Sequence, residues 1–168
     1  MKEIAIREAT ADDIPAIVGV RRAAFTDEEV RGFTPPEHSM FYSPRELRRA
    51  WDKDDRLKNG WKVAVAQKSR EIVGFIVFGM KGDFGFIDNL NVTKQQEGKG
   101  VGRALVNYVE DVAKAAGCNV METDTTENAE GVPWKSYGFW TKMGYEDTGE
   151  RLPTEWDFKE IRFVKNLT

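Results

Sequence analysis

The sequence has few of the residues from which disulfide frameworks and metal sites are built. Its 168 residues include one cysteine, Cys118, and one histidine, His38. A single cysteine excludes an internal disulfide and a cysteine-based zinc site, so we expect Cys118 to be a buried thiol. No apolar run approaches the roughly twenty residues of a transmembrane helix, and the first residues lack the pattern of a secretory signal. We therefore expect a cytoplasmic protein with no membrane partner and no metal site.

An excess of basic residues is also missing. The chain has 25 Lys and Arg against 28 Asp and Glu, which gives a formal net charge of -3. This balance argues against a nucleic-acid partner, because nucleic-acid binding needs a basic face. A chain of this length forms one domain with a substantial core, and no repeat or linker divides it. We expect a single domain over residues 1–168 and leave the oligomeric state open, a homodimer included.

The most informative stretch is a glycine-rich turn between an expected strand and an expected helix. The apolar run 86–92 ends as a strand does, and apolar residues then recur at helical spacing over residues 101–116. Between them, Gly98, Gly100 and Gly102 lack a Cβ atom, so a ligand can approach the backbone closely. The first turn of a helix adds free N–H groups and the positive end of the helix dipole. The sequence therefore predicts an anion site that suits a phosphate or pyrophosphate.

Two common phosphate-binding motifs do not fit this turn. A nucleotide P-loop needs Ser or Thr after Gly-Lys, but Gly100 follows Lys99. A dinucleotide-binding motif needs a third glycine where Arg103 stands. A nucleotide-binding enzyme is therefore a less favoured interpretation of this turn.

The strand, turn and helix instead resemble the acetyl-CoA loop of the GCN5-related N-acetyltransferase (GNAT) family, whose signature is Gln/Arg-x-x-Gly-x-Gly/Ala. Two registers match, one from Gln95 to Gly100 and one from Glu97 to Gly102. The second fits the family's spacing after Val92 better, and it places Glu97 where the family has Gln or Arg. We expect Glu97 to point outward and the backbone to bind the cofactor.

The resemblance implies acetyl-CoA as the cofactor and a small-molecule or peptide amine as the acceptor. In this family the pantetheine arm pairs with the main chain of the strand before the glycine loop, and an asparagine often follows the next strand. The cofactor-binding residues that we expect on this basis are Leu90, Asn91, Val92, Glu97, Gly98, Lys99, Gly100, Val101, Gly102, Arg103, Asn128 and Trp140.

One part of the sequence departs from the family pattern. The family's Tyr-x-Lys-x-Gly-Phe is matched by residues 140–145, but Trp140 stands in place of the tyrosine that is often proposed to reprotonate the CoA thiolate. An indole N–H does not titrate usefully. Tyr137, one helical turn earlier, is our candidate for the replacement acid. The alternative is that Tyr137 packs Trp134 and Trp140 against the sheet.

Acyl transfer also needs a group that accepts a proton from the amine. A primary amine with a pKa of about 10 is mostly protonated at pH 7, so a general base helps. Asp88 is the leading candidate, because two-residue alternation places it on the same strand face as Leu90 and Val92; the alternative is a structural carboxylate. Glu122, on the neighbouring strand, is the second candidate. His38 is less favoured, since a loop histidine is more often solvated.

The remaining pattern predicts an α/β (α+β) fold with a mixed, mostly antiparallel sheet of about six to seven strands flanked by helices. Three consecutive strands joined by short turns indicate an antiparallel meander, and residues 150–155 are expected to form a loop near the site. The expected strands are 3–8, 61–67, 72–80, 86–92, 118–123 and 156–165, and the expected helices are 10–25, 44–52, 101–116 and 133–144.

We therefore expect an acyl-CoA-dependent N-acetyltransferase that moves an acetyl group from acetyl-CoA directly to a primary amine in a ternary complex. The main alternative is a non-catalytic acyl-CoA-binding or sensing domain, which Glu97 and Trp140 favour. The sequence does not fix the identity of the amine. Aromatic residues that favour a cationic or aromatic acceptor are Phe41, Tyr42, Trp134 and Trp156.

Overall fold

The structure, a computed structural model, describes residues 3–24, 26, 29, 39–53 and 61–168. His38 lies outside these residues. The strands are β1 (Ile4–Glu8), β2 (Lys62–Lys68), β3 (Glu71–Lys81), β4 (Phe84–Val92), β5 (Val120–Glu127), β6 (Glu146–Pro153) and β7 (Lys159–Asn166). The helices are α1 (Ile14–Arg22), α2 (Pro44–Lys53), α4 (Val101–Ala115) and α5 (Ser136–Lys142), with 3-10 turns η1 (Ala11–Asp13), η3 (Met40–Tyr42) and η4 (Lys94–Gln96).

The strands form one seven-stranded sheet in the order β1-β2-β3-β4-β5-β7-β6. All neighbours pair antiparallel except β4 and β5, which are parallel. The expected mixed, mostly antiparallel sheet flanked by helices is confirmed. The parallel pair arises because α4 carries the chain from the end of β4 back to the start of β5, as a crossover between parallel strands requires.

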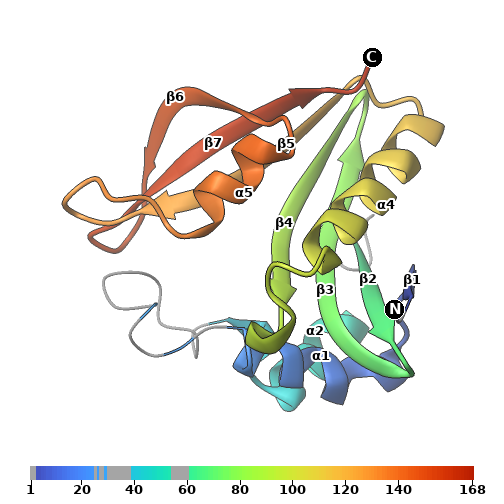
Figure 1. Ribbon diagram of the computed structural model, residues 1–168. Helices are drawn as coiled ribbons and strands as arrows, with labels where there is room; N and C mark the ends of the chain where they lie inside the picture. The colour runs from blue at the N-terminus through green and yellow to red at the C-terminus, as the bar shows by residue number, and fades with distance from the viewer. Residues whose placement is uncertain (1–2, 25, 27–28, 30–38, 54–60) are drawn as a thin grey trace.

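The central feature of the sheet is a fork between its two parallel strands. Pairing of β4 with β5 runs only from Phe84 opposite Val120 to Ile87 opposite Thr123. Beyond these residues the two strands part, and Figure 1 shows them diverging below their shared end. The rest of β4 therefore has backbone groups along its β5 side that are available to a ligand.

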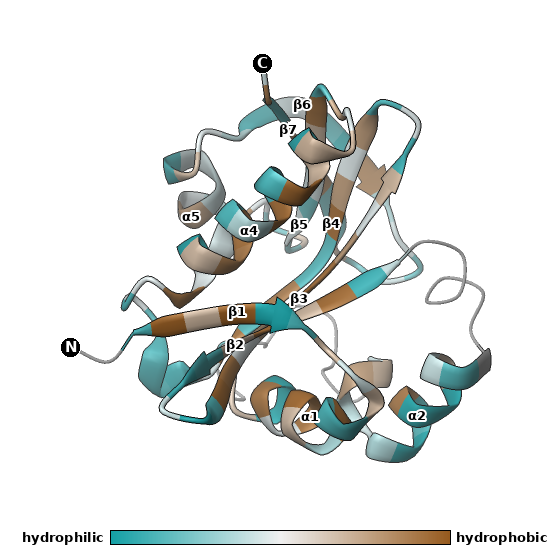
Figure 2. Ribbon diagram, turned by 90° about the vertical axis from the view of Figure 1, so that its right-hand side faces the viewer, coloured by the Kyte–Doolittle hydropathy of each residue, from teal (hydrophilic) through white to brown (hydrophobic). Residues whose placement is uncertain are grey.

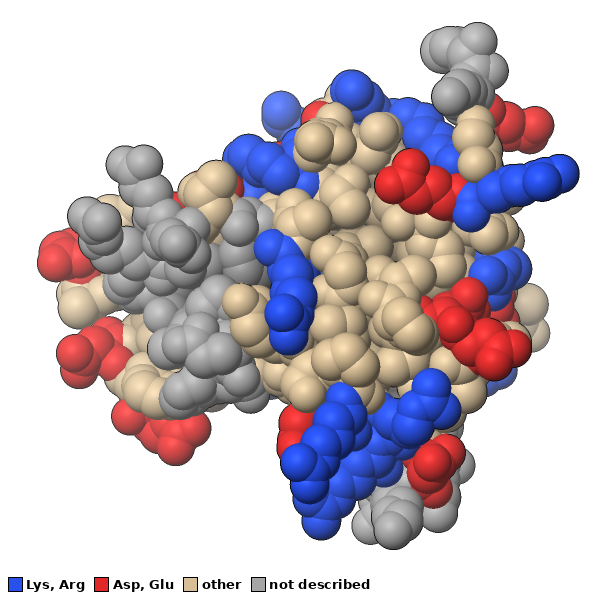
Figure 3. Space-filling view, turned by 90° about the horizontal axis from the view of Figure 1, so that it is seen from below, with Lys and Arg blue, Asp and Glu red and all other residues tan. Residues whose placement is uncertain are grey.

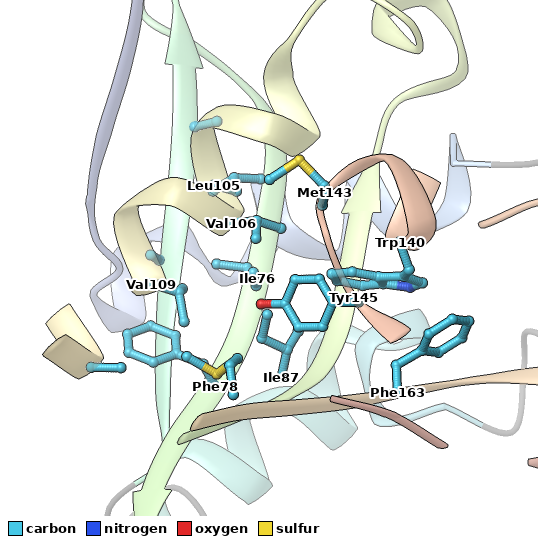
Figure 4. Close-up of a cluster of buried hydrophobic side chains, with 14 of the residues drawn as sticks. Ile76, Phe78, Ile87, Leu105, Val106, Val109, Trp140, Met143, Tyr145 and Phe163 are labelled. Atoms are coloured by element: carbon cyan, nitrogen blue, oxygen red, sulfur yellow. The ribbon is translucent and has the colours of Figure 1, made fainter. Parts of the chain in front are cut away.

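Two apolar cores hold the sheet, one on each face (Figure 2). On one face, α4 and α5 cover a cluster that includes Ile76 of β3, Leu105 of α4 and Trp140 of α5. Figure 4 shows these side chains within the cluster. On the other face, α1 and α2 cover a cluster that includes Phe41 and Phe75, whose ring centroids lie 5.2 Å apart. The fork is therefore anchored on both faces by packed side chains.

The outer surface of α2 is basic, as its polar pattern suggests. Arg45, Arg48 and Arg49 are exposed. Seen from below, Lys and Arg side chains lie mainly at the lower and upper edges of the view, and the middle of that face is largely uncharged (Figure 3).

The structure corrects several expected boundaries in the C-terminal third. The expected loop 150–155 was wrong, because residues 146–153 form β6, which pairs with β7. β6 has few apolar residues, so it gave no strand pattern, and its pairing is irregular between Asp147 and Arg151. β5 runs on to Glu127 rather than ending at residue 123, and α5 begins at Ser136 rather than 133.

Candidate active site

A cavity of about 610 Å³ lies at the fork, bordered by β4, β5, the glycine loop, the start of α4 and the start of α5. Its size is within the usual range for a small-molecule or cofactor pocket, about 300–1,000 Å³. We call it the cleft. The cleft joins segments from both halves of the chain, from Arg21 on α1 to Lys142 on α5.

The glycine loop closes one end of the cleft with exposed backbone. Gly98 and Gly100 have φ angles of 77° and 88°, a region that favours glycine, and both line the cleft. The first amide to bond within α4 is that of Ala104, which donates to the Gly100 carbonyl at 3.0 Å. The amides of residues 101–103 come before it and have no partner within the helix. This backbone geometry is of the kind that an anion site at a helix N-terminus requires.

Glu97 is neutralised by two lysines from different parts of the chain. Its Oε2 lies 3.4 Å from Lys94 Nζ and 3.2 Å from Lys135 Nζ. Both lysines also contact Glu29 Oε2, each at 2.9 Å, and they lower the pKa of Glu29 to about 2 against the opposing effect of burial. The acidic residue of the glycine loop is therefore held within a ring of four alternating charges, which would reduce its repulsion of an anion.

Leu90, Asn91 and Val92, on the far part of β4, line the cleft. The Asn91 side chain is buried and accepts a hydrogen bond from Arg21 Nη1 at 2.8 Å. Its own Nδ2 donates to Asn89 Oδ1 at 2.8 Å. Burial lowers the pKa of Arg21 to about 10. These contacts fix the backbone of β4 from the α1 side.

Asp88 lines the cleft, but not through the simple alternation that we expected. Phe78 of β3 pairs with Ile87 and the next residue, Val77, pairs with Asn89, so Asp88 is an additional residue in β4. Such a bulge breaks the two-residue alternation, and the shared face with Leu90 predicted from it was wrong. The bulge places Asp88 at the point where β4 leaves β5.

A second carboxylate at the fork was not recognised from the sequence. Asp124 is the first residue of β5 beyond the last pair with β4, and it lines the cleft with Asp88. Asp124 is exposed at the cleft, yet desolvation by the protein around it is the largest cause that raises its pKa, to about 7. Repulsion from Glu160 and Asp88 adds to the shift, and Arg162 opposes it. A carboxyl with this pKa gains and loses its proton near neutral pH, as a general base must.

The structure separates other expected site residues from the cleft. Tyr137 is not among the residues lining it; its hydroxyl donates to Asp147 Oδ2 at 2.9 Å, and that bond raises its pKa. Because β5 is longer than expected, Asn128 lies past the cleft in the following loop, where its Oδ1 accepts from the amide of Val132 at 2.9 Å. Glu122 lines an adjoining hollow instead. These placements do not favour the roles expected for Tyr137 and Asn128.

The remaining expected residues divide into two groups. Trp140 lines the cleft and is 3% exposed, with its ring 5.1 Å from that of Tyr145, so it packs the cleft wall onto the core. Gly102 and Arg103 also line the cleft. Lys99 and Val101 are not among the residues that line the cleft: Lys99 is exposed, and Val101 is buried in the core. Cleft residues that sequence patterns did not indicate include Thr123, Thr125, Lys135, Ser136 and Phe139.

Neither a metal-binding cluster nor a membrane helix is found within the residues that the structure describes. No three of their His, Cys, Asp and Glu side chains are arranged to hold a metal ion. None of their helices has the length and apolar character needed to cross a membrane.

Comparison with known proteins places this geometry among acetyltransferases. The model of the acetyltransferase (GNAT) family matches residues 22–145. The PaiA N-acetyltransferase of Thermoplasma acidophilum, solved in complex with coenzyme A, has a TM-score of 0.73 at 18% identity, covering 98% of this chain and 99% of that one. An N-acetyltransferase from Staphylococcus aureus has a TM-score of 0.71 at 19% identity, covering 99% of each chain.

An aminoglycoside 6'-N-acetyltransferase, also complexed with coenzyme A, has a TM-score of 0.71 at 19% identity, covering 98% of this chain and 97% of that one. A sequence comparison with curated proteins finds no match. Structural likeness at these identities concerns the fold, whereas the family model matches well over half of the sequence. The chain therefore belongs to the GNAT family of acetyltransferases.

Proposed function

We propose that the protein transfers an acetyl group from acetyl-CoA directly to a primary amine in a ternary complex. The observation that carries the proposal is the fork, with a glycine-loop anion site at one end and two carboxylates, Asp88 and Asp124, where the strands part. The cofactor's phosphates would bind the amides of the glycine loop, and its amide-bearing arm would pair with the main chain of residues 90–92. This arrangement would bring the thioester to the two carboxylates.

The chemistry needs one proton acceptor and a carbonyl made electrophilic by hydrogen bonds. An ammonium acceptor gives a first proton to Asp124 or Asp88, and its freed nitrogen adds to the thioester carbonyl to form the N–C bond. The C–S bond then breaks, and the second proton on nitrogen passes to solvent as the amide forms. Backbone N–H groups of β4 would stabilise the oxyanion that forms in between. The coenzyme A thiolate leaves, and because a thiol has a pKa of about 8.5, it takes its proton from solvent without a protein acid. This route needs neither Tyr137 nor Trp140 to titrate.

Thiol release from acetyl-CoA in the presence of a panel of primary amines tests the proposal. We expect release that depends on the amine, and we expect Asp88→Asn to slow it while leaving coenzyme A affinity unchanged. Tight coenzyme A binding without thiol release for any amine would instead support the alternative, a non-catalytic acyl-CoA-binding or sensing domain. Protection against unfolding by ATP but not by coenzyme A would support a nucleotide-binding enzyme. The cytoplasmic location stays a prediction.

A further inference from the structure

A second, smaller hollow of about 230 Å³ meets the cleft at the fork. The two cavities share four lining residues, Ile87, Asp88, Thr123 and Asp124, which are the last paired residues of β4 and β5 and the first residues beyond them. The hollow therefore begins where the acetyl group of a bound cofactor would lie. A molecule in it would reach the thioester from the side opposite the glycine loop.

The hollow lies on the sheet face that carries α1 and α2. Its lining residue Phe86 pairs with Gly79, two residues along β3 from Val77, which is part of the core beneath these helices. On β5, Glu122 pairs in register with Phe86, and Asp124 follows two residues later on the same face. Acceptor and cofactor would thus occupy different faces of the fork.

Aromatic rings form the outer wall of the hollow. The ring of Phe86 lies 4.7 Å from that of Trp61 at 61°, and 6.3 Å from that of Phe84. All three residues line the hollow and are only partly buried. Aromatic faces attract ammonium groups, and hydrocarbon chains pack well against them. This wall suits a slender aliphatic chain with a cationic end.

The charges of the hollow favour a cation as well. Of the described residues that line it, Arg162 is the only basic one. Arg162 is shared between Glu122, at 3.9 Å, and Glu150, at 3.8 Å, both longer than a hydrogen bond. Glu122 therefore retains capacity to accept hydrogen bonds from a ligand. A carboxylate on the ligand would meet Glu122 and Asp124 and would be repelled.

We propose that this hollow is the acceptor site and that the acceptor is an aliphatic diamine of about the length of 1,4-diaminobutane. Its reacting amine lies at Asp88 and Asp124, and its second ammonium group lies beside Glu122 and the aromatic wall. Two residues of a strand span about 7 Å, which a four-carbon chain can bridge. The inference rests on the proposed function, because it assumes that acetyl transfer occurs at the fork.

Three acceptors of one length test it: 1,4-diaminobutane, n-butylamine and 4-aminobutanoate, which differ only in the group at the far end. We expect kcat/KM to be highest for the diamine, about tenfold above n-butylamine, because its second ammonium group makes a charged hydrogen bond with Glu122. We expect it to be lowest for 4-aminobutanoate, because Glu122 and Asp124 repel its carboxylate. In Glu122→Gln, the preference for the diamine over n-butylamine should fall to about threefold or less. Asp111→Asn, which removes one charge from the exposed side of α4, should keep the tenfold preference.

The outcomes separate this inference from the proposed function. Equal kcat/KM for the diamine and n-butylamine, a preference for 4-aminobutanoate, or an unchanged diamine preference in Glu122→Gln would overturn the diamine site while leaving acetyl transfer intact. Absence of thiol release with every amine, despite coenzyme A binding measured by calorimetry, would overturn acetyl transfer and the diamine site together. Coenzyme A affinity should be the same in the wild type and in Glu122→Gln, which shows that the variant is folded.

Discussion

Lys135 Nζ lies 3.2 Å from Glu97 Oε2 and joins the segment before α5 to the glycine loop across the mouth of the cleft. Lys94 contacts the same Glu97 oxygen at 3.4 Å. The two lysines explain how an acidic residue could be tolerated beside the proposed phosphate site, because they compensate much of its charge. Glu97 and Lys135 are thus a unit, and neither can be changed without altering the charge that a bound cofactor meets.

We predict that Lys135→Met weakens coenzyme A binding about two- to fivefold, as expected for one partly exposed ion pair. Calorimetric titration at low salt measures this change, and raising the salt concentration should reduce it. Adding Glu97→Gln should restore the affinity, because the uncompensated charge is then removed. Lys114→Met, at the exposed end of α4, is the matched control and should bind as the wild type does. Equal affinity in Lys135→Met would show that the lysine does not act on the phosphate site.

Gly100→Val is predicted to abolish coenzyme A binding. Gly100 has a φ of 88°, and a side chain there would project where the phosphates should approach the backbone. The strained backbone should also lower the free energy of unfolding by about 1–2 kcal/mol. Gly117→Val separates the two effects, since Gly117 has a φ of 89° with open space around it at the far end of α4. It should lose similar stability and bind coenzyme A normally; loss of binding in both variants would contradict a role specific to the glycine loop.

A partly buried ion pair joins α4 to β7. Lys165 Nζ lies 2.9 Å from Glu110 Oε1, and the Tyr145 hydroxyl donates to Glu110 Oε2 at 2.9 Å. Lys165→Met should destabilise the fold by about 1–3 kcal/mol, because it leaves the buried Glu110 carboxylate without its cation. Urea unfolding measures this loss, and adding Glu110→Leu should recover much of it. Lys159→Met, an exposed position on the same strand, should be near neutral.

The sequence contained enough to predict the strand, glycine loop and helix that we propose bind acetyl-CoA, the acetyl donor. Gly98, Gly100 and the apolar run of β4 are local signals, because spacing within one segment fixes both the turn and the start of α4. The fold class followed from the same regularity together with the family resemblance, and it is confirmed. Sequence patterns predicted those features that depend on residues close together in the chain.

The part of the site that we propose binds the amine acceptor could not be predicted in the same way. Asp88 and Asp124 come together only because β4 and β5 pair in parallel for a few residues and then part, and pairing register leaves no mark in either segment. The bulge at Asp88 depends on β3, which is likewise invisible in β4 alone. For the same reason the aromatic residues chosen from the sequence are only partly those at the site: Trp134 lines the cleft, whereas Phe41 is 1% exposed in the core, and Phe86, which was not chosen, lines the hollow.

Asp124 should control how the activity depends on pH. Its pKa of about 7 predicts that kcat/KM for an amine rises as pH increases through 7, since only the carboxylate can take the proton. Measured between pH 5.5 and 9.5, Asp124→Asn should lower kcat/KM and remove this inflection, while coenzyme A affinity stays unchanged. An inflection that survives in Asp124→Asn would assign the titration to another group, with Asp88 the first to test.

The same carboxyl should leave a signature in stability. Its pKa is raised from 3.8 to about 7 in the folded protein, so between these values the folded state holds a proton that the unfolded state has released. The contribution of Asp124 to stability then falls as pH rises from about 4 to 7. In Asp124→Asn this contribution is absent, so the variant should become progressively more stable than the wild type over that window, with a constant difference above it. Urea unfolding at pH 5 and pH 8 measures the trend, and a difference that is equal at both would mean that Asp124 titrates at an ordinary pKa.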